Sequence, residues 1–157
     1  MNLEDNIIMV AIKIDDLYQE YIDHRKVDLN KEQFLWIVNL FPALLVVLSD
    51  GIVDSEEWAE VKKLSSKLGK EFASDDLGLQ KEENLAMIYR SEFQFLLKNR
   101  DKWEIKFLNA LKDYFEENKE SKAFVLESMF LFAKASGGVS TAEADTIEFL
   151  TKVLLIE

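Results

Sequence analysis

The stretch LLVVLSDGIVDSEEWAEVKKLSSKL, residues 44–68, decides the fold, because the chain carries a second version of it. The sequence FLFAKASGGVSTAEADTIEFLTKVL, residues 130–154, aligns with it without a gap at a constant offset of 86 residues. Each copy has the pattern of an apolar helix, a glycine turn, a β-branched residue and a second helix. We expect Val53 and Val139 to pack inward as the link between the helices. The repeat therefore predicts two pseudo-repeated helix–turn–helix units that pack about a twofold-like axis.

Apolar side chains follow helical spacing along almost the whole chain, and no segment alternates strictly at period two. A length of 157 residues, with one proline and five glycines, suits one compact domain with few breaks. We expect an all-α, compact bundle of about seven helices, a single domain over residues 1–157. The predicted helices carry apolar stripes over residues 7–21, 34–48 (kinked or divided at Pro42), 58–68, 85–97, 103–114, 124–135 and 141–155. Residues 72–80 are predicted to form a loop, and residues 115–122 a solvated turn between helices.

The net charge of −11 argues against nucleic acid and anionic membrane surfaces as partners, since both attract clustered lysine and arginine. Basic proteins and cations are the natural attractants of such a chain. The longest apolar run, residues 34–48, is shorter than the roughly 20 residues that a membrane span requires, so we expect no direct membrane insertion. The first ten residues carry acids where a secretory signal would carry basic residues. A cytoplasmic protein is the expectation.

The structure of the two turns is enough to explain the presence of several of their residues. Gly51 suits the left-handed position that ends a helix. Asp54 and Glu57 have the spacing of a capping box, and Ser140 and Glu143 repeat it. A cap of this kind stabilises a helix by about 1 kcal/mol. Stability of the fold is therefore a sufficient explanation for these residues.

Asp50 and Glu56 are not explained in this way. Asp50 follows the end of an apolar helix, where a negative charge is unfavourable by roughly 0.3–1 kcal/mol, and the capping box does not need Glu56. The second copy has Ser136 and Ala142 at these two positions. The second copy thus keeps the glycine and the capping residues that the turn needs, but has no acid at the positions of Asp50 and Glu56. This difference marks Asp50 and Glu56 as candidate functional residues and the others as structural.

Four carboxylates, those of Asp50, Asp54, Glu56 and Glu57, stand within eight residues. Like charges 4 Å apart repel by about 4 kcal/mol at an effective dielectric near 20, and a hard cation with oxygen ligands would relieve the crowding. Calcium or magnesium is the expected ion, because zinc prefers histidine and cysteine. The alternative is that these side chains extend into water without a ligand. Acidic side chains in the first turn of a helix are favoured by the helix dipole.

An apolar helix, then Asp-Gly, an apolar residue and a helix that opens with glutamates, present twice in an acidic helical chain, resembles the tellurite-resistance protein B (TerB) family and its TerB-like relatives. The resemblance implies an all-α fold with two acidic motifs on one surface, and an accessory role in bacterial stress and tellurite resistance with metal-cation binding. The family's acidic positions correspond to Asp50, Asp54, Glu56 and Glu57. The second motif departs from the pattern at Ser136-Gly137 and keeps only Ser140 and Glu143, which puts a second or shared cation site in doubt.

Catalytic signatures are sparse. His24 is the single histidine, at the predicted end of the first helix, and cysteine is absent, so neither a Ser–His–Asp nor a Cys–His arrangement can be assembled. No phosphate-binding loop of the Gly-x-x-x-x-Gly-Lys type occurs. We expect no enzyme. Two main hypotheses stay open. The first is a cation-responsive TerB-like module, and the second is a metal-free domain that docks a basic protein partner through its acidic face. A carboxylate-based hydrolase is the third alternative.

Overall fold

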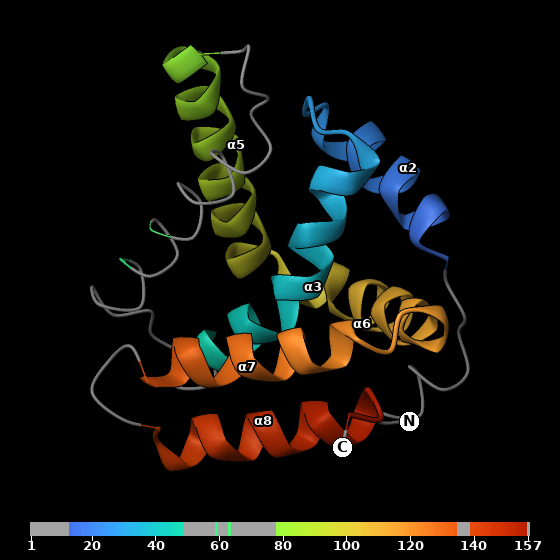
Figure 1. The fold of residues 1–157 in the computed structure, drawn as a ribbon, viewed down its shortest axis with the longest axis vertical. Coiled ribbons are helices and arrows are strands. Elements are labelled where there is room, and N and C mark those ends of the chain that lie inside the picture. The colour runs from blue at the N-terminus through green and yellow to red at the C-terminus, as the bar shows by residue number, and fades with distance from the viewer. Residues whose placement is uncertain (1–12, 49–58, 60–62, 64–77, 135–138, 157) are drawn as a thin grey trace.

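The computed structural model describes residues 13–48, 59, 63, 78–134 and 139–156, and these residues form an all-helical protein (Figure 1). The helices are α2 (Ile14–Arg25), α3 (Lys31–Leu48), α5 (Gly78–Lys98), α6 (Arg100–Glu117), α7 (Ser121–Lys134) and α8 (Thr141–Val153). No strand occurs within the described ranges. The predicted all-α class is confirmed, with six described helices where about seven were expected.

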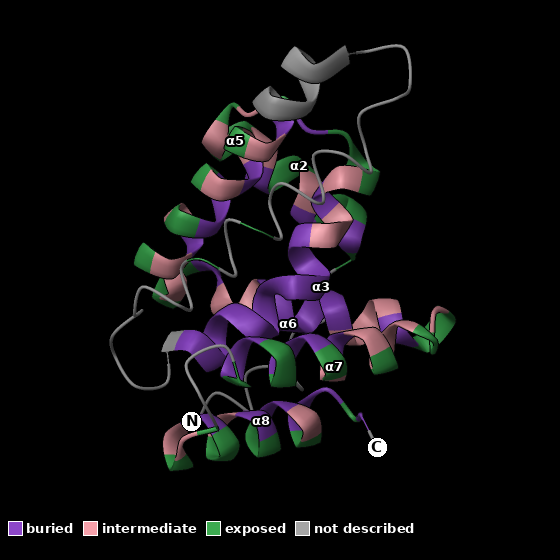
Figure 2. Ribbon diagram, turned by 60° about the vertical axis from the view of Figure 1, so that its left-hand side comes forward, coloured by how far each residue is buried: buried purple, intermediate pink, exposed green. Residues whose placement is uncertain are grey.

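Helix α3 is the centre of the bundle. It packs most extensively against α7 and also contacts α2, α5, α6 and α8. Helices α7 and α8 run side by side in opposite directions, and α6 lies between them and α2 (Figure 1). Figure 2 shows the buried residues gathered on α3 and on the faces that its neighbours turn toward it, with the exposed residues on the outer faces. The first helices of the two predicted repeat units, α3 and α7, are therefore in direct contact.

The core is rich in aromatic side chains. The ring of Tyr21 lies 5.1 Å from Phe34, 5.1 Å from Trp103 and 5.7 Å from Phe107, measured between centroids. These four side chains are fully buried, and burying a side chain of this size stabilises a fold by about 1.5–3 kcal/mol. The cluster joins α2, α3 and α6.

Pro42 lies inside α3, which continues from Lys31 to Leu48 as one helix. Proline has no N–H to donate to the carbonyl of Val38, and its ring crowds the preceding turn, so a bend is the expected outcome. The two ends of α3 do run in different directions (Figures 1 and 2). Of the two outcomes predicted for Pro42, the kink is the one observed.

Two helices extend into residues that were predicted to form connections. Gly78, placed in the loop over residues 72–80, already begins α5. Phe115, predicted both to pack in the core with other aromatics and to begin the solvated turn, is buried within α6. The connection from α6 to α7 is thus only residues 118–120.

Two apolar side chains are more exposed than predicted. Val139 is 37% exposed, so the expectation that it packs inward is wrong. The buried residues of α8 begin farther along the helix, at Glu143 and Ile147. The helical spacing of the aromatics predicts core packing for most of them, Phe130 included in that group, but Phe130 is 39% exposed on α7.

The first repeat unit lies largely outside the described residues. Within residues 49–77 only Ala59 and Lys63 are described, and both are helical and exposed. The pseudo-twofold relation of the units therefore stays a prediction, as does the inward position of Val53. None of the helices described is long and apolar enough to cross a membrane.

Candidate functional site

The acidic motif that the sequence singled out falls outside the described part of the chain. Asp50, Asp54, Glu56 and Glu57 all lie there, and so do residues 135–138 of the second turn. Ser140 and Glu143 are described. Among described residues, no group of three or more histidine or acidic side chains is arranged to hold a metal ion.

Ser140 and Glu143 form the predicted capping box at the start of α8. The Glu143 backbone N–H donates to Ser140 Oγ at 3.0 Å, and the Ser140 backbone N–H donates to Glu143 Oε1 at 2.9 Å. Glu143 is only 1% exposed, and its second oxygen, Oε2, has no hydrogen-bond partner among the described residues. A buried carboxylate oxygen without a donor is costly. This atom is therefore available to a donor or to a cation.

His24 has a structural position. It stands in the last turn of α2, where a positive charge is favoured by the helix dipole. Its ring packs near Phe95 and Trp103, with centroids 6.0 and 5.5 Å apart. These contacts explain the residue without a catalytic role.

An ion pair between buried Glu92 and partly exposed Arg25 joins α2 to α5. Glu92, 2% exposed, accepts hydrogen bonds from Arg25 Nε at 2.7 Å, Arg25 Nη2 at 2.8 Å and Tyr21 Oη at 2.7 Å. Burial, together with the Glu92 charge, raises the pKa of Tyr21, and the hydrogen bond to Glu92 raises the pKa of Arg25. Arg25 also lies 4.0 Å from the centroid of Phe95. Both Glu92 oxygens accept hydrogen bonds, so the network holds α2 against α5.

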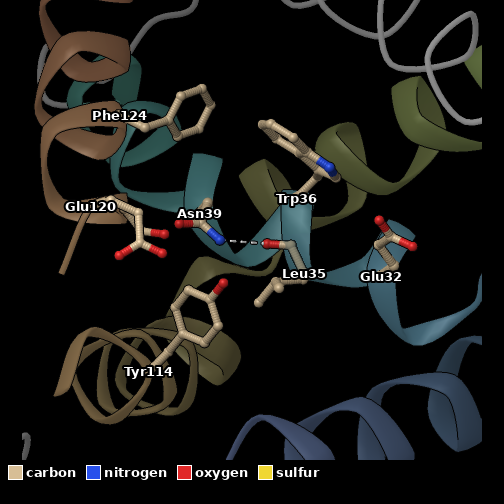
Figure 3. Close-up of a pocket in the computed structure, with 8 residues that line it drawn as sticks. Glu32, Leu35, Trp36, Asn39, Tyr114, Glu120 and Phe124 are labelled. Atoms are coloured by element: carbon tan, nitrogen blue, oxygen red, sulfur yellow. Dashed lines mark hydrogen bonds between the residues drawn. The ribbon is translucent and has the colours of Figure 1, made fainter. Parts of the chain in front are cut away.

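A hollow of about 360 Å³ opens between the first half of α3, the end of α6 and the start of α7 (Figure 3). We call it the aromatic hollow. Its described lining residues are Glu32, Leu35, Trp36, Asn39, Tyr114, Glu120, Ser121 and Phe124. Trp36 and Phe124 form one wall, with centroids 5.1 Å apart and ring planes at 85°. Figure 3 shows Tyr114 on the opposite side and the carboxylates of Glu32 and Glu120 on either side of Asn39.

Asn39 brings an unsatisfied polar atom to this hollow. The residue is 6% exposed, and its Nδ2 donates to the Leu35 carbonyl at 2.9 Å. Its Oδ1 is buried and has no donor among the described residues. Asn39 is the one polar residue of α3 between Phe34 and Leu48. A buried oxygen without a donor, here Asn39 Oδ1, is unfavourable for the fold. Helix packing alone does not explain an asparagine at this position.

The two carboxylates at the edge of the aromatic hollow have no ion pair with a described residue. Lys31, beside Glu32, pairs with Asp15, and Lys122, near Glu120, donates to the Leu155 carbonyl at 3.0 Å. No lysine or arginine is among the described lining residues. The hollow therefore has a negative edge and an apolar wall.

A second hollow, of about 210 Å³, shares Tyr114 with the first, and we call it the acidic hollow. Its described lining residues are Lys13, Ile14, Asp15, Asp113, Tyr114, Glu116, Glu117 and Asn118. Lys13 pairs with Asp113 at 3.2 Å, a hydrogen bond that raises the pKa of Lys13. Glu116 and Glu117 stand at the C-terminal end of α6, where the last turn has no basic residue. A negative charge at that pole is unfavourable, so the two hollows together form a surface of negative potential.

Comparison with known proteins adds no assignment: no family model matches the chain, and neither do curated proteins or solved structures.

Sequence reasoning did not find the aromatic hollow. The sequence predicts core packing for most aromatics at helical spacing, Trp36 among them, places Phe124 in a helix, and places Glu120 in a solvated turn. Their helical spacing is the same whether the side chains fill a core or line its edge. The one available signal was Asn39, a polar residue in the apolar run over residues 34–48.

Proposed function

We propose that the chain is a non-enzymatic, TerB-like accessory module that docks a positively charged protein partner through its acidic surface. The surface consists of the aromatic hollow and the acidic hollow, which meet at Tyr114. The observation that carries the proposal is the concentration of carboxylates there. Asp15 and Asp113 pair with lysines, whereas the lining glutamates have no ion pair among the described residues: Glu32, Glu116, Glu117 and Glu120. The TerB resemblance rests on the turn motifs of the sequence and stands as part of this proposal.

The charge of the whole chain supports the same reading. A net charge of −11 creates a long-range field that attracts basic partners and speeds their encounter with the surface. Glu116 and Glu117 add to the negative end of the α6 dipole, which increases the negative charge beside the acidic hollow. An arrangement that is unfavourable for the helix alone becomes favourable when a cation docks against it.

The proposal is tested by fluorescence anisotropy with labelled peptides. A short peptide in which lysine and arginine alternate with glycine and serine binds saturably at low salt, and the matched peptide with glutamate in place of each basic residue does not bind. Equal binding of the two peptides, or no binding of the basic one, contradicts the proposal.

A second candidate function is binding of calcium or magnesium at the turn motif, through Asp50, Asp54, Glu56 and Glu57. It is favoured by the unpartnered, buried Oε2 of Glu143, which occupies in the second copy the position of Glu57 in the first. A divalent cation would compensate a buried carboxylate. The TerB resemblance implies a cation at the same motif.

Thermal melts of chelator-stripped protein with calcium, magnesium, manganese or zinc test this candidate. A ligand at 100 times its dissociation constant stabilises the fold by about 2.7 kcal/mol, which raises Tm by roughly 5–11 °C at this chain length. The double exchange Asp50→Ser and Glu56→Ala copies the second repeat unit and abolishes the rise while the protein stays folded. No rise with any cation removes this candidate and leaves the docking proposal in place.

A further inference from the structure

We propose that the aromatic hollow is a lysine-binding site, which receives the side chain of one lysine from the basic partner. This inference rests on the proposed function and narrows it from a charged surface to one pocket and one residue type. A volume of about 360 Å³ is in the range of small-ligand sites and accommodates a single long side chain.

The walls suit the two parts of a lysine side chain. Leu35, Trp36 and Phe124 present apolar and aromatic surface, against which the four-carbon stem packs. The ammonium group then lies near the aromatic rings, whose faces attract cations, and near the carboxylate of Glu120. Figure 3 shows Glu120, Asn39 and Tyr114 directing polar atoms toward the same space.

The floor supplies hydrogen-bond acceptors for the ammonium group. A lysine ammonium has three donors. Glu120 offers a carboxylate, Tyr114 a hydroxyl oxygen, and Asn39 the Oδ1 that has no donor among the described residues. An ammonium that donates to Oδ1, while Nδ2 keeps its hydrogen bond to the Leu35 carbonyl, satisfies this buried oxygen. Binding thus removes a cost that the unliganded protein carries.

The ring geometry favours lysine over arginine. A guanidinium is planar and binds best when it stacks flat on aromatic faces or pairs in a bidentate fork. Trp36 and Phe124 meet at 85° with centroids 5.1 Å apart, so they pack against each other and leave no parallel slot between them. A compact ammonium does not need such a slot.

The test measures the affinity of two labelled peptides, one with lysine and one with arginine at every basic position, for three forms of the full-length protein. The forms are the unchanged protein, the double variant Glu32→Gln/Glu120→Gln at the hollow, and the control Asp145→Asn/Glu148→Gln. The control removes the same charge from exposed positions of α8, which does not line the hollow. Thermal melts establish that all three are folded.

We expect the unchanged protein to bind the lysine peptide more tightly than the arginine peptide. The hollow variant should lose at least about tenfold in affinity for the lysine peptide, a factor that corresponds to about 1.4 kcal/mol, and the control should retain most of it. Tyr114→Phe, which leaves the net charge unchanged, should also weaken lysine binding and affect arginine binding less.

The alternative outcomes separate the two proposals. Equal affinity for the two peptides, weakened to the same extent by both double variants, would overturn the lysine site while supporting a diffuse acidic docking surface. No binding of either peptide by the unchanged protein would overturn both.

Discussion

At the scale of single residues, Glu92 shows how this protein uses a buried charge. Its carboxylate accepts three hydrogen bonds from Arg25 and Tyr21, so the cost of removing it from water is offset by satisfied partners. Helical periodicity placed residue 92 within a predicted helix. It could not reveal the partners, because they lie 67 and 71 residues away along the chain.

Glu92→Gln should destabilise the protein by about 1.5–3 kcal/mol, because it replaces the charged acceptor of two hydrogen bonds from Arg25, a side chain that stays partly exposed, by a neutral amide. Urea unfolding at neutral pH measures the change. Glu127→Gln, which removes a charge from an exposed position of α7, should change stability by no more than about 0.5 kcal/mol. Equal effects of the two substitutions would show that the ion pair contributes nothing beyond a surface contact.

Tyr21 makes stability depend on alkaline pH. Its pKa is raised in the folded protein, chiefly by burial, so the folded state keeps a proton that the unfolded chain loses near pH 10. The contribution is fully present below that pH. Above it, the free energy of unfolding falls by up to about 1.4 kcal/mol per pH unit.

Urea unfolding between about pH 8 and 11 checks this expectation for Tyr21. The decline above pH 10 should be less steep in Tyr21→Phe by about one proton, since the other tyrosines and the lysines titrate in both proteins. Parallel curves would mean that Tyr21 does not hold its proton more strongly in the folded state.

At the scale of elements, the α8 capping box was predictable from sequence, because both partners lie within one turn. The exposed Val139, one residue earlier, was not, since its burial depends on what packs across the turn. The aromatic hollow could not be predicted from the sequence either, because it also depends on tertiary packing. Its residues come from three helices, α3, α6 and α7, and from the connection between the last two, and only tertiary packing brings them together.

Ser140→Ala should destabilise the protein by about 1 kcal/mol, because the Glu143 backbone N–H loses its acceptor. At this chain length the change lowers Tm by about 2–4 °C. Thr141→Ala at the adjacent exposed position is the control and should leave Tm nearly unchanged. An equal fall in both variants would contradict the contribution of the cap.

At the scale of the whole molecule, the net charge of −11 acts together with the place where the carboxylates gather. The charge excess was readable from composition. Its location near Tyr114 was not, because Asp15, Glu32 and Glu117 come from three different helices. The acidic motif over residues 50–57 and the TerB resemblance remain predictions.

Salt dependence checks the role of this charge. The Debye length falls from about 10 Å at 0.1 M to about 3 Å at 1 M ionic strength, so raising salt should weaken binding of a basic peptide steeply. Anisotropy titrations at several salt concentrations measure the slope. Affinity that does not change with salt would mean that apolar contact alone drives docking.

The most direct test of the central claim is a titration of ¹⁵N-labelled protein with the lysine peptide, followed by NMR. The chain has three tryptophans, whose indole N–H groups give separate signals. We predict that the Trp36 indole and the Asn39 side-chain amide shift together, while the indole of the fully buried Trp103 does not. Shifts confined to residues away from the aromatic hollow, or no shifts at saturating peptide, would contradict the account.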